Sequence, residues 1–221
     1  MIRVLFCDVA PLYEEGARES VLRRLSPERR HKADRFLFTA DKALCAGAGV
    51  LLDKALEEYG LSENTVRYAY GPHGKPFIPE LPEFRFNISH SGMSAVLAVS
   101  DREIGIDIEK EGKADLAVAK RFFTAPEYAY LCAQPDSNEK NRAFFRIWTA
   151  KESFIKAVGT GLTVSPETFE IRISGSEMSV IQDIVPETYT LRELSLRPGY
   201  LSALSVRGDT AEDIQYIRID L

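Results

Sequence analysis

The stretch Gly105-Ile106-Asp107-Ile108-Glu109, written GIDIE, places two carboxylates between isoleucines near the middle of a 221-residue chain. Alternation of this kind predicts a β-strand, in which the isoleucines face one side and Gly105, Asp107 and Glu109 face the other. The two carboxylates would then share one face, roughly 6–7 Å apart at their Cα atoms. Such a face is either solvated or able to hold a hard divalent cation such as Mg²⁺. The stretch alone leaves both readings open.

Strands and helices are predicted on both sides of this stretch in two successive blocks. Short extended runs separated by turns predict strands over 84–88, 94–99 and 103–109. Before them, patterning predicts a strand over 2–9 and helices over 14–25, 28–38 and 40–59, the last ended by Gly60. After them it predicts helices over 114–122, 126–132 and 138–158, then strands over 169–173, 179–184, 188–196, 200–206 and 214–219. The blocks meet near GIDIE without a linker, so we expect an α+β protein whose two halves pack together.

Composition narrows the class of protein. Apolar residues make up 45% and charged residues 28% of the chain, and the formal net charge is −5, which argues against a nucleic-acid binder. No apolar run approaches the roughly 18 residues of a membrane span, and the first residues do not resemble a secretory signal. Cys7, Cys45 and Cys132 are widely spaced without a CxxC pair, which fits reduced thiols. We therefore expect a cytoplasmic protein without a membrane segment.

A second candidate cluster lies on the helix predicted over 138–158. Trp148, Glu152 and Lys156 are spaced i, i+4 and i+8 and therefore share one helical face. An exposed Glu152–Lys156 ion pair is the usual meaning of such spacing. The only tryptophan of the chain lies on the same face, which indicates that this face is at least partly buried.

Two further segments could bind an anion. Ser89-His90-Ser91-Gly92 follows a predicted strand, where hydroxyl groups and backbone amides can hold phosphate oxygens. A structural histidine is the alternative, and a serine hydrolase is disfavoured because the chain lacks a GxSxG elbow. Arg29 and Lys32 are i, i+3 neighbours on a predicted helix, where they form either a solvated face or a cationic site.

Taken together, four segments in this order resemble the Sfp-type 4'-phosphopantetheinyl transferases: FNISHSG (86–92), GIDIE (105–109), FFTAPEY (122–128) and WTAKESFIKAVGTGL (148–162). Gly74-Lys75-Pro76 matches a further motif of that family. The resemblance implies two similar α/β halves related by a pseudo-twofold, here residues 1–104 and 105–221, with the active site between them. It also implies the reaction, in which the phosphopantetheine arm of coenzyme A is moved onto a serine of an apo acyl or peptidyl carrier protein.

By position, the resemblance implies a role for each candidate residue. Asp107, Glu109 and Glu152 would bind Mg²⁺, with Mn²⁺ as an alternative, and Glu152 and Lys156 would be catalytic. Glu152 would accept the proton of the carrier serine, and Lys156 would stabilise the leaving group. Coenzyme A would be bound by the remaining set, which is Arg29, Lys32, Lys75, Pro76, Ser89, His90 and Lys156.

One departure from the family pattern concerns the nucleotide. Relatives carry a basic or hydroxyl residue where Leu44 and Cys45 stand here, so either Lys42 substitutes or the 3'-phosphate depends on Arg29, Lys32 and His90.

The segment 120–123 is a candidate carrier-docking surface, with an amphipathic core helix as the equal alternative. The chain's length and two-half organisation resemble the larger branch of that family, whose members are usually monomers, so a monomer is expected. A catalytically inactive binding module of the same fold is the alternative function, and it predicts loss of a carboxylate.

Overall fold

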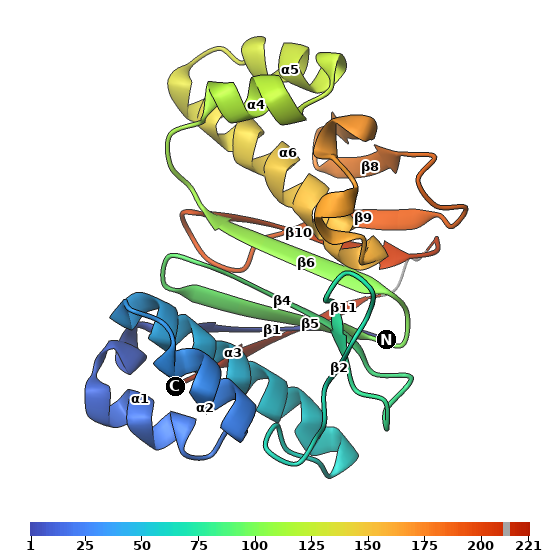
Figure 1. The fold of residues 1–221 in the computed structure, drawn as a ribbon. Coiled ribbons are helices and arrows are strands. Elements are labelled where there is room, and N and C mark those ends of the chain that lie inside the picture. The colour runs from blue at the N-terminus through green and yellow to red at the C-terminus, as the bar shows by residue number, and fades with distance from the viewer. Residues whose placement is uncertain (210–212) are drawn as a thin grey trace.

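The computed structural model describes residues 1–209 and 213–221 as an α+β fold with two sheets between two groups of helices (Figure 1). The first sheet has the strand order β11-β1-β5-β4. Its strands are β1 (Ile2–Asp8), β4 (Arg85–Ser91), β5 (Ser94–Ser100) and β11 (Ile214–Ile219). The pairs β1–β5 and β4–β5 are antiparallel, and β1–β11 is parallel.

The second sheet repeats the topology of the first. Its order is β6-β10-β9, with both pairs antiparallel, just as β1-β5-β4 is ordered in the first sheet. Its strands are β6 (Ile104–Lys110), β9 (Tyr189–Leu194) and β10 (Tyr200–Arg207). In each half, the first strand is followed by helices and then pairs with the last of the three strands, as expected for two similar halves.

Two small hairpins complete the strands. One pairs β7 (Glu170–Ser174) with β8 (Glu177–Ile181), and the other pairs β2 (Ala69–Tyr70) with β3 (Pro76–Phe77). Sequence patterning did not predict β2 and β3, because two-residue strands are too short to show a period.

Helices cover the outer faces of the two sheets (Figure 1). The N-terminal helices are α1 (Glu15–Leu22), α2 (Pro27–Asp34) and α3 (Thr39–Leu56). The C-terminal helices are α4 (Leu116–Phe122), α5 (Ala125–Cys132) and α6 (Ser137–Val158). Glycines in left-handed conformation follow α3 and α6, with φ of 67° at Gly60 and 78° at Gly159, which confirms the predicted ends of these helical segments.

The inner faces of the sheets pack against each other. Ile104, Ile106 and Ile108 are fully buried in a cluster that includes side chains from β1, β5, β9 and β10. This confirms that the isoleucines of GIDIE share one face. The face carrying Gly105 and Asp107 is also buried, because α6 covers it, so β6 is not a half-solvated strand.

The chain returns to its first half at the end. Strand β11 leaves the C-terminal block and pairs with β1 in the register Ile2↔Ile214 to Cys7↔Ile219. The predicted division into 1–104 and 105–221 falls at the start of β6 and stays a prediction, while the first sheet itself contains strands from both ranges. Within the described residues, none of the helices combines the length and apolarity that a membrane span requires.

Candidate active site

The site begins where helix α6 crosses strand β6. A Cβ atom on Gly105 would stand 2.1 Å from the carbonyl oxygen of Ser153 and 2.3 Å from the amide nitrogen of Ala157. Only glycine therefore lets the backbone of α6 approach β6 this closely. The contact brings one face of α6, with Glu152 and Lys156, over the carboxylates of β6.

Asp107 and Lys156 form the central contact of the site. Lys156 Nζ lies 2.6 Å from Asp107 Oδ1 and 3.0 Å from Ser89 Oγ, and Ser89 Oγ donates to Asp107 Oδ1 at 2.8 Å. The side chain of Asp107 is 4% exposed, and that of Lys156 is 28% exposed. A nearly buried carboxylate is thus neutralised by a lysine that still reaches solvent.

Side chains of β4 join the two sheets beside this contact. Asn87 Oδ1 accepts a hydrogen bond from the amide of Ile106 at 2.9 Å, and Ser91 Oγ accepts one from the amide of Lys110 at 3.0 Å. Ser91 Oγ also donates to Glu109 Oε2 at 2.7 Å. Asn87, Ser89 and Ser91 alternate along the strand, so period-two spacing could have identified the whole polar face in the sequence.

The other two carboxylates have pKa values above their ordinary range. Burial raises the pKa of Glu109, and Asp107 adds to the rise, although the hydrogen bond from Ser91 opposes it. Burial also raises the pKa of Glu152, with further contributions from the charges of Asp107 and Glu109. Within the described residues, the carboxylate of Glu152 accepts no hydrogen bond. Burial and the charge of neighbouring acids thus make Glu109 and Glu152 better proton acceptors when ionised.

Asp107, Glu109 and Glu152 line a single cavity with Ser89, His90, Trp148 and Lys156, which brings together the predicted strand, turn and helix residues. In the described part of the chain, no three His, Cys, Asp or Glu side chains are gathered as a ready metal site. Asp107 Oδ2, however, is buried and lacks a hydrogen-bond partner. An orphaned carboxylate oxygen beside two further carboxylates fits the all-oxygen ligation that Mg²⁺ prefers. The assignment of these acids as metal ligands stays a prediction.

A second cavity adjoins the first through His90. It is lined by Arg29, Lys32 and His90, which the sequence identified, together with Cys45 and others. Partial desolvation and then the charge of Lys156 lower the pKa of His90, although its side chain is exposed to solvent. Of the two residues that stand at the departure from the family pattern, Cys45 lines this cavity, whereas Leu44 packs in the core. Lys42 is not among the lining residues, so Arg29 and Lys32 are the cationic groups that line this cavity, beside the imidazole of His90.

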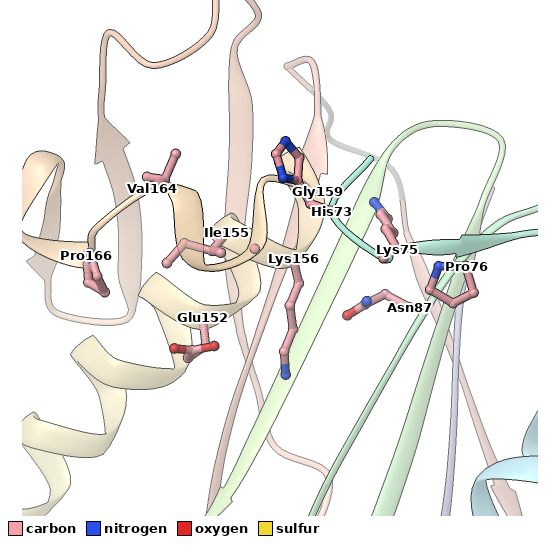
Figure 2. Close-up of a pocket in the computed structure, with 12 residues that line it drawn as sticks. His73, Lys75, Pro76, Asn87, Glu152, Ile155, Lys156, Gly159, Val164 and Pro166 are labelled. Atoms are coloured by element: carbon pink, nitrogen blue, oxygen red, sulfur yellow. The ribbon is translucent and has the colours of Figure 1, made fainter. Parts of the chain in front are cut away.

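A third cavity shares Glu152 and Lys156 with the first (Figure 2). Glu152, Ile155 and Lys156 project into it from α6, and Lys75 and Pro76 line it from the β2–β3 hairpin. The ammonium group of Lys75 is already engaged, because it donates to Glu103 Oε2 at 2.7 Å, the carbonyl of Ala157 at 2.9 Å and the carbonyl of Ile104 at 3.1 Å. In this structure Lys75 therefore fastens the hairpin to both β6 and α6.

Charged residues flanking the site have structural roles. Lys151, fully buried, forms an ion pair with Glu127 at 2.8 Å and donates to the carbonyls of Pro166 and Phe169.

In the segment 120–123, the cationic side chains are exposed, but Phe123 is 6% exposed and stacks on Phe144. Phe123 therefore belongs to the hydrophobic core and is not part of an exposed docking surface.

Comparison with known proteins places the chain in a family. The model described as "4'-phosphopantetheinyl transferase, N-terminal" matches residues 14–102, and that of the "4'-phosphopantetheinyl transferase superfamily" matches residues 103–199. Sfp, a 4'-phosphopantetheinyl transferase of Bacillus subtilis, is 35% identical over 212 residues, which cover 94% of this chain and 93% of that protein. HetI, a 4'-phosphopantetheinyl transferase of a Nostoc species, is 33% identical over 88% of this chain and 83% of its own.

Solved structures of shorter proteins match about half of the chain. A holo-(acyl-carrier-protein) synthase of Bacillus anthracis, in complex with CoA (3',5'-ADP), is 24% identical over 48% of this chain and 94% of its own, with a TM-score of 0.41. The holo-[acyl-carrier-protein] synthase of Thermotoga maritima is 19% identical over 49% of this chain and 64% of its own, with a TM-score of 0.40. The length and identity of the sequence matches to Sfp and HetI carry the assignment: this chain belongs to the Sfp-type 4'-phosphopantetheinyl transferase family.

Proposed function

We propose that this protein moves the 4'-phosphopantetheine arm of coenzyme A to a serine of an apo acyl or peptidyl carrier protein and releases adenosine 3',5'-bisphosphate. The proposal rests above all on one observation: Asp107, Glu109, Glu152 and Lys156 line one cavity at the junction of the two halves, beside Ser89 and His90. Three acids and a lysine are the groups that transfer of a phosphoryl-linked arm requires.

The cavities offer separate places for the parts of coenzyme A. Arg29, Lys32 and His90 line the cavity that we assign to the nucleotide, where cations can pair with phosphate. The cavity beside Ile155, Val164 and Pro166 is more apolar and suits the pantetheine arm. Pro76 lines both cavities, and the engaged Lys75 would act through the hairpin that it fastens rather than through a free ammonium group.

The residues of the junction would carry the chemistry. Mg²⁺ held by Asp107, Glu109 and Glu152 would neutralise charge on the pyrophosphate of coenzyme A. The carrier serine oxygen forms a bond to the phosphorus that bears the pantetheine arm, and the bond from that phosphorus to the bridging oxygen breaks. Glu152 takes the serine proton, directly or through a water molecule. Lys156 and His90 stabilise the charge that gathers on the leaving bisphosphate and on the phosphates.

The alternative is an inactive binding module that kept the fold. It predicts that at least one of the three acids has been lost, and Asp107, Glu109 and Glu152 are all present and share one cavity. A different Mg²⁺ phosphotransferase or hydrolase does not account for the four motifs in register. We propose further that the protein acts as a monomer on its carrier.

An intact-mass assay tests the proposal. The protein is incubated with coenzyme A, Mg²⁺ and a panel of apo carriers from fatty-acid, polyketide and nonribosomal-peptide systems. A phosphopantetheine mass increase on the carrier supports the transferase, and the panel shows which carrier is preferred. Tight binding of coenzyme A without any mass increase on any carrier would favour the inactive module.

A further inference from the structure

Glu63 is a buried acid that none of the family motifs contains. It follows the short 3-10 turn η2 (Glu57–Tyr59), and its side chain is 0% exposed. Its carboxylate accepts four hydrogen bonds: from the amide of Ser26 at 2.6 Å, from Ser26 Oγ at 3.0 Å, from Arg29 Nε at 2.7 Å and from Tyr68 OH at 2.8 Å. Ser26 precedes helix α2, and Arg29 lies in its first turn.

These bonds fix the start of α2 as well as one side chain on it. Ser26 is the N-cap of the helix, and its hydroxyl accepts the amide of Arg29 at 3.2 Å while it donates to Glu63. Glu63 is held in turn, because its own amide donates to Asp53 Oδ1 at 2.8 Å. The helix that carries Arg29 and Lys32 is therefore tied at its first turn to the end of α3.

Glu63 binds Arg29 through only one edge of the guanidinium. The ion pair uses Nε, and Nη1 lies 3.5 Å from the carbonyl of Cys45, at the limit of a hydrogen bond. Arg29 lines the cavity that also contains Lys32 and His90. A guanidinium held at Nε keeps its two terminal nitrogens in a fixed plane, which suits bidentate binding of a phosphate.

The electrostatics show that Glu63 is ionised. Burial alone would raise its pKa, but the charge of Arg29 and the hydrogen bonds from Arg29, Ser26 and Tyr68 outweigh burial and lower it. Glu63 in return raises the pKa of Arg29 against the effect of burial. The negative charge of Glu63 lies beside an anion-binding cavity and would repel the anion. A benefit to anion binding must therefore offset this repulsion if Glu63 serves the cavity.

We propose that Glu63 is a positioning residue, which fixes Arg29 and the first turn of α2 for binding of the 3'-phosphate of coenzyme A. This inference rests on the proposed function, because that function assigns the cavity to the nucleotide. It makes 3'-phosphate recognition dependent on a residue 34 positions away from the arginine that provides the contact.

Calorimetric titration with two nucleotides tests the inference without any need for transfer. Adenosine 3',5'-bisphosphate and adenosine 5'-monophosphate differ only in the 3'-phosphate. We expect Glu63→Gln to weaken the bisphosphate at least about tenfold and the monophosphate less than about twofold. Tyr68→Phe, which keeps the charge and removes one donor, should act in the same direction to a smaller extent, and it carries the test if Glu63→Gln does not fold. Glu57→Gln is the matched control, because Glu57 is exposed and paired with Lys54.

A double-variant comparison separates positioning from general damage. If Glu63 acts through Arg29, adding Glu63→Gln to Arg29→Ala should cause no further loss of bisphosphate affinity. Equal losses for the two nucleotides, or no loss, would overturn the inference in favour of a purely structural acid. Tighter binding of the bisphosphate would overturn it in favour of simple repulsion. Failure of the proposed function would be seen separately, as absence of transfer by the unmodified protein to every carrier.

Discussion

Lys156 on helix α6 lies 2.6 Å from Asp107 on strand β6, so the helix and the strand meet through a charge pair beside Ser89 of β4. Asp107 has one oxygen in that pair and the other buried without a partner. The contact depends on how closely α6 packs on β6, and the first prediction concerns that distance.

Gly105→Ala should destabilise the protein and disturb the site. The added Cβ would meet backbone atoms of Ser153 and Ala157, which cannot rotate away, so we expect a loss of about 1–3 kcal/mol in the free energy of unfolding. Transfer activity should fall by more than the loss of folded protein alone would cause, because a shift of α6 also displaces Glu152 and Lys156. Urea unfolding and the intact-mass assay measure the two effects. Gly16→Ala is the matched control, since nothing lies within 4 Å of its added Cβ. A Gly105→Ala protein with unchanged stability would contradict the close approach.

Glu152→Gln should nearly abolish transfer while coenzyme A still binds. The amide cannot take the proton of the carrier serine and is a poorer metal ligand, so we expect a fall in turnover of at least about 100-fold. Single-turnover kinetics with an apo carrier measures the rate, and calorimetry with coenzyme A measures binding. An active variant would remove Glu152 from both roles.

Removal of the divalent cation should stop turnover. Three carboxylates around a pyrophosphate repel it unless a cation lies between them, so excess chelator should leave no measurable transfer. Adding Mg²⁺ beyond the chelator should restore the rate, and Mn²⁺ should substitute. Full activity in excess chelator would refute the metal assignment for Asp107, Glu109 and Glu152.

Arg29→Ala combined with Lys32→Ala should weaken coenzyme A more than dephospho-coenzyme A. Each contact of a charged side chain with phosphate contributes about 1.5–3 kcal/mol, so loss of both contacts should lower the affinity for coenzyme A by roughly 100-fold or more. Dephospho-coenzyme A lacks the 3'-phosphate and should be affected little. Equal losses for the two compounds would remove the 3'-phosphate assignment from this cavity.

The stability of the metal-free protein should depend on Glu152 in a pH-dependent way. Its pKa is raised in the folded protein by burial and by Asp107 and Glu109, so the folded state holds this proton more tightly than the unfolded state. Glu152 therefore contributes most to the stability of the folded state at pH values below its pKa in the unfolded chain. That stabilisation is lost as the pH rises through its pKa in the folded protein. Glu152→Gln should make the metal-free protein more stable at pH 8, with the difference vanishing toward pH 4. Urea unfolding across this range, with Glu57→Gln as the control, checks the sign. A stabilisation that grows toward acidic pH would contradict it.

Much of the site could be predicted because local periods decide which residues share a face. Period two placed Asp107 and Glu109 together on β6, and the helical period placed Glu152 and Lys156 together on α6. The boundaries of the major strands and helices follow the same patterns, with α2 ending at Asp34 rather than continuing to residue 38. The four motifs then indicated which faces meet.

What could not be predicted depends on contacts between distant segments. Glu63 gives no local signal, since its partners lie 34 and 37 residues before it and 5 residues after it. The three acceptors of Lys75 come from β6, the turn before it and the end of α6, and no sequence period links them. The sequence leaves Phe123 open between an exposed docking residue and a core residue, because the seven-residue helix α4 that precedes it is too short to define a buried face.

The parallel pairing of β1 with β11 also bears on synthesis in the cell. Val4 has Ala98 on one side and Tyr216 on the other, so one edge of β1 is open until the ribosome has released the segment 214–219. An unpaired strand edge is a template for association with other chains. The N-terminal block would therefore emerge and fold against its helices while one edge remains unprotected, and this interval is when we expect the nascent chain to need a chaperone most.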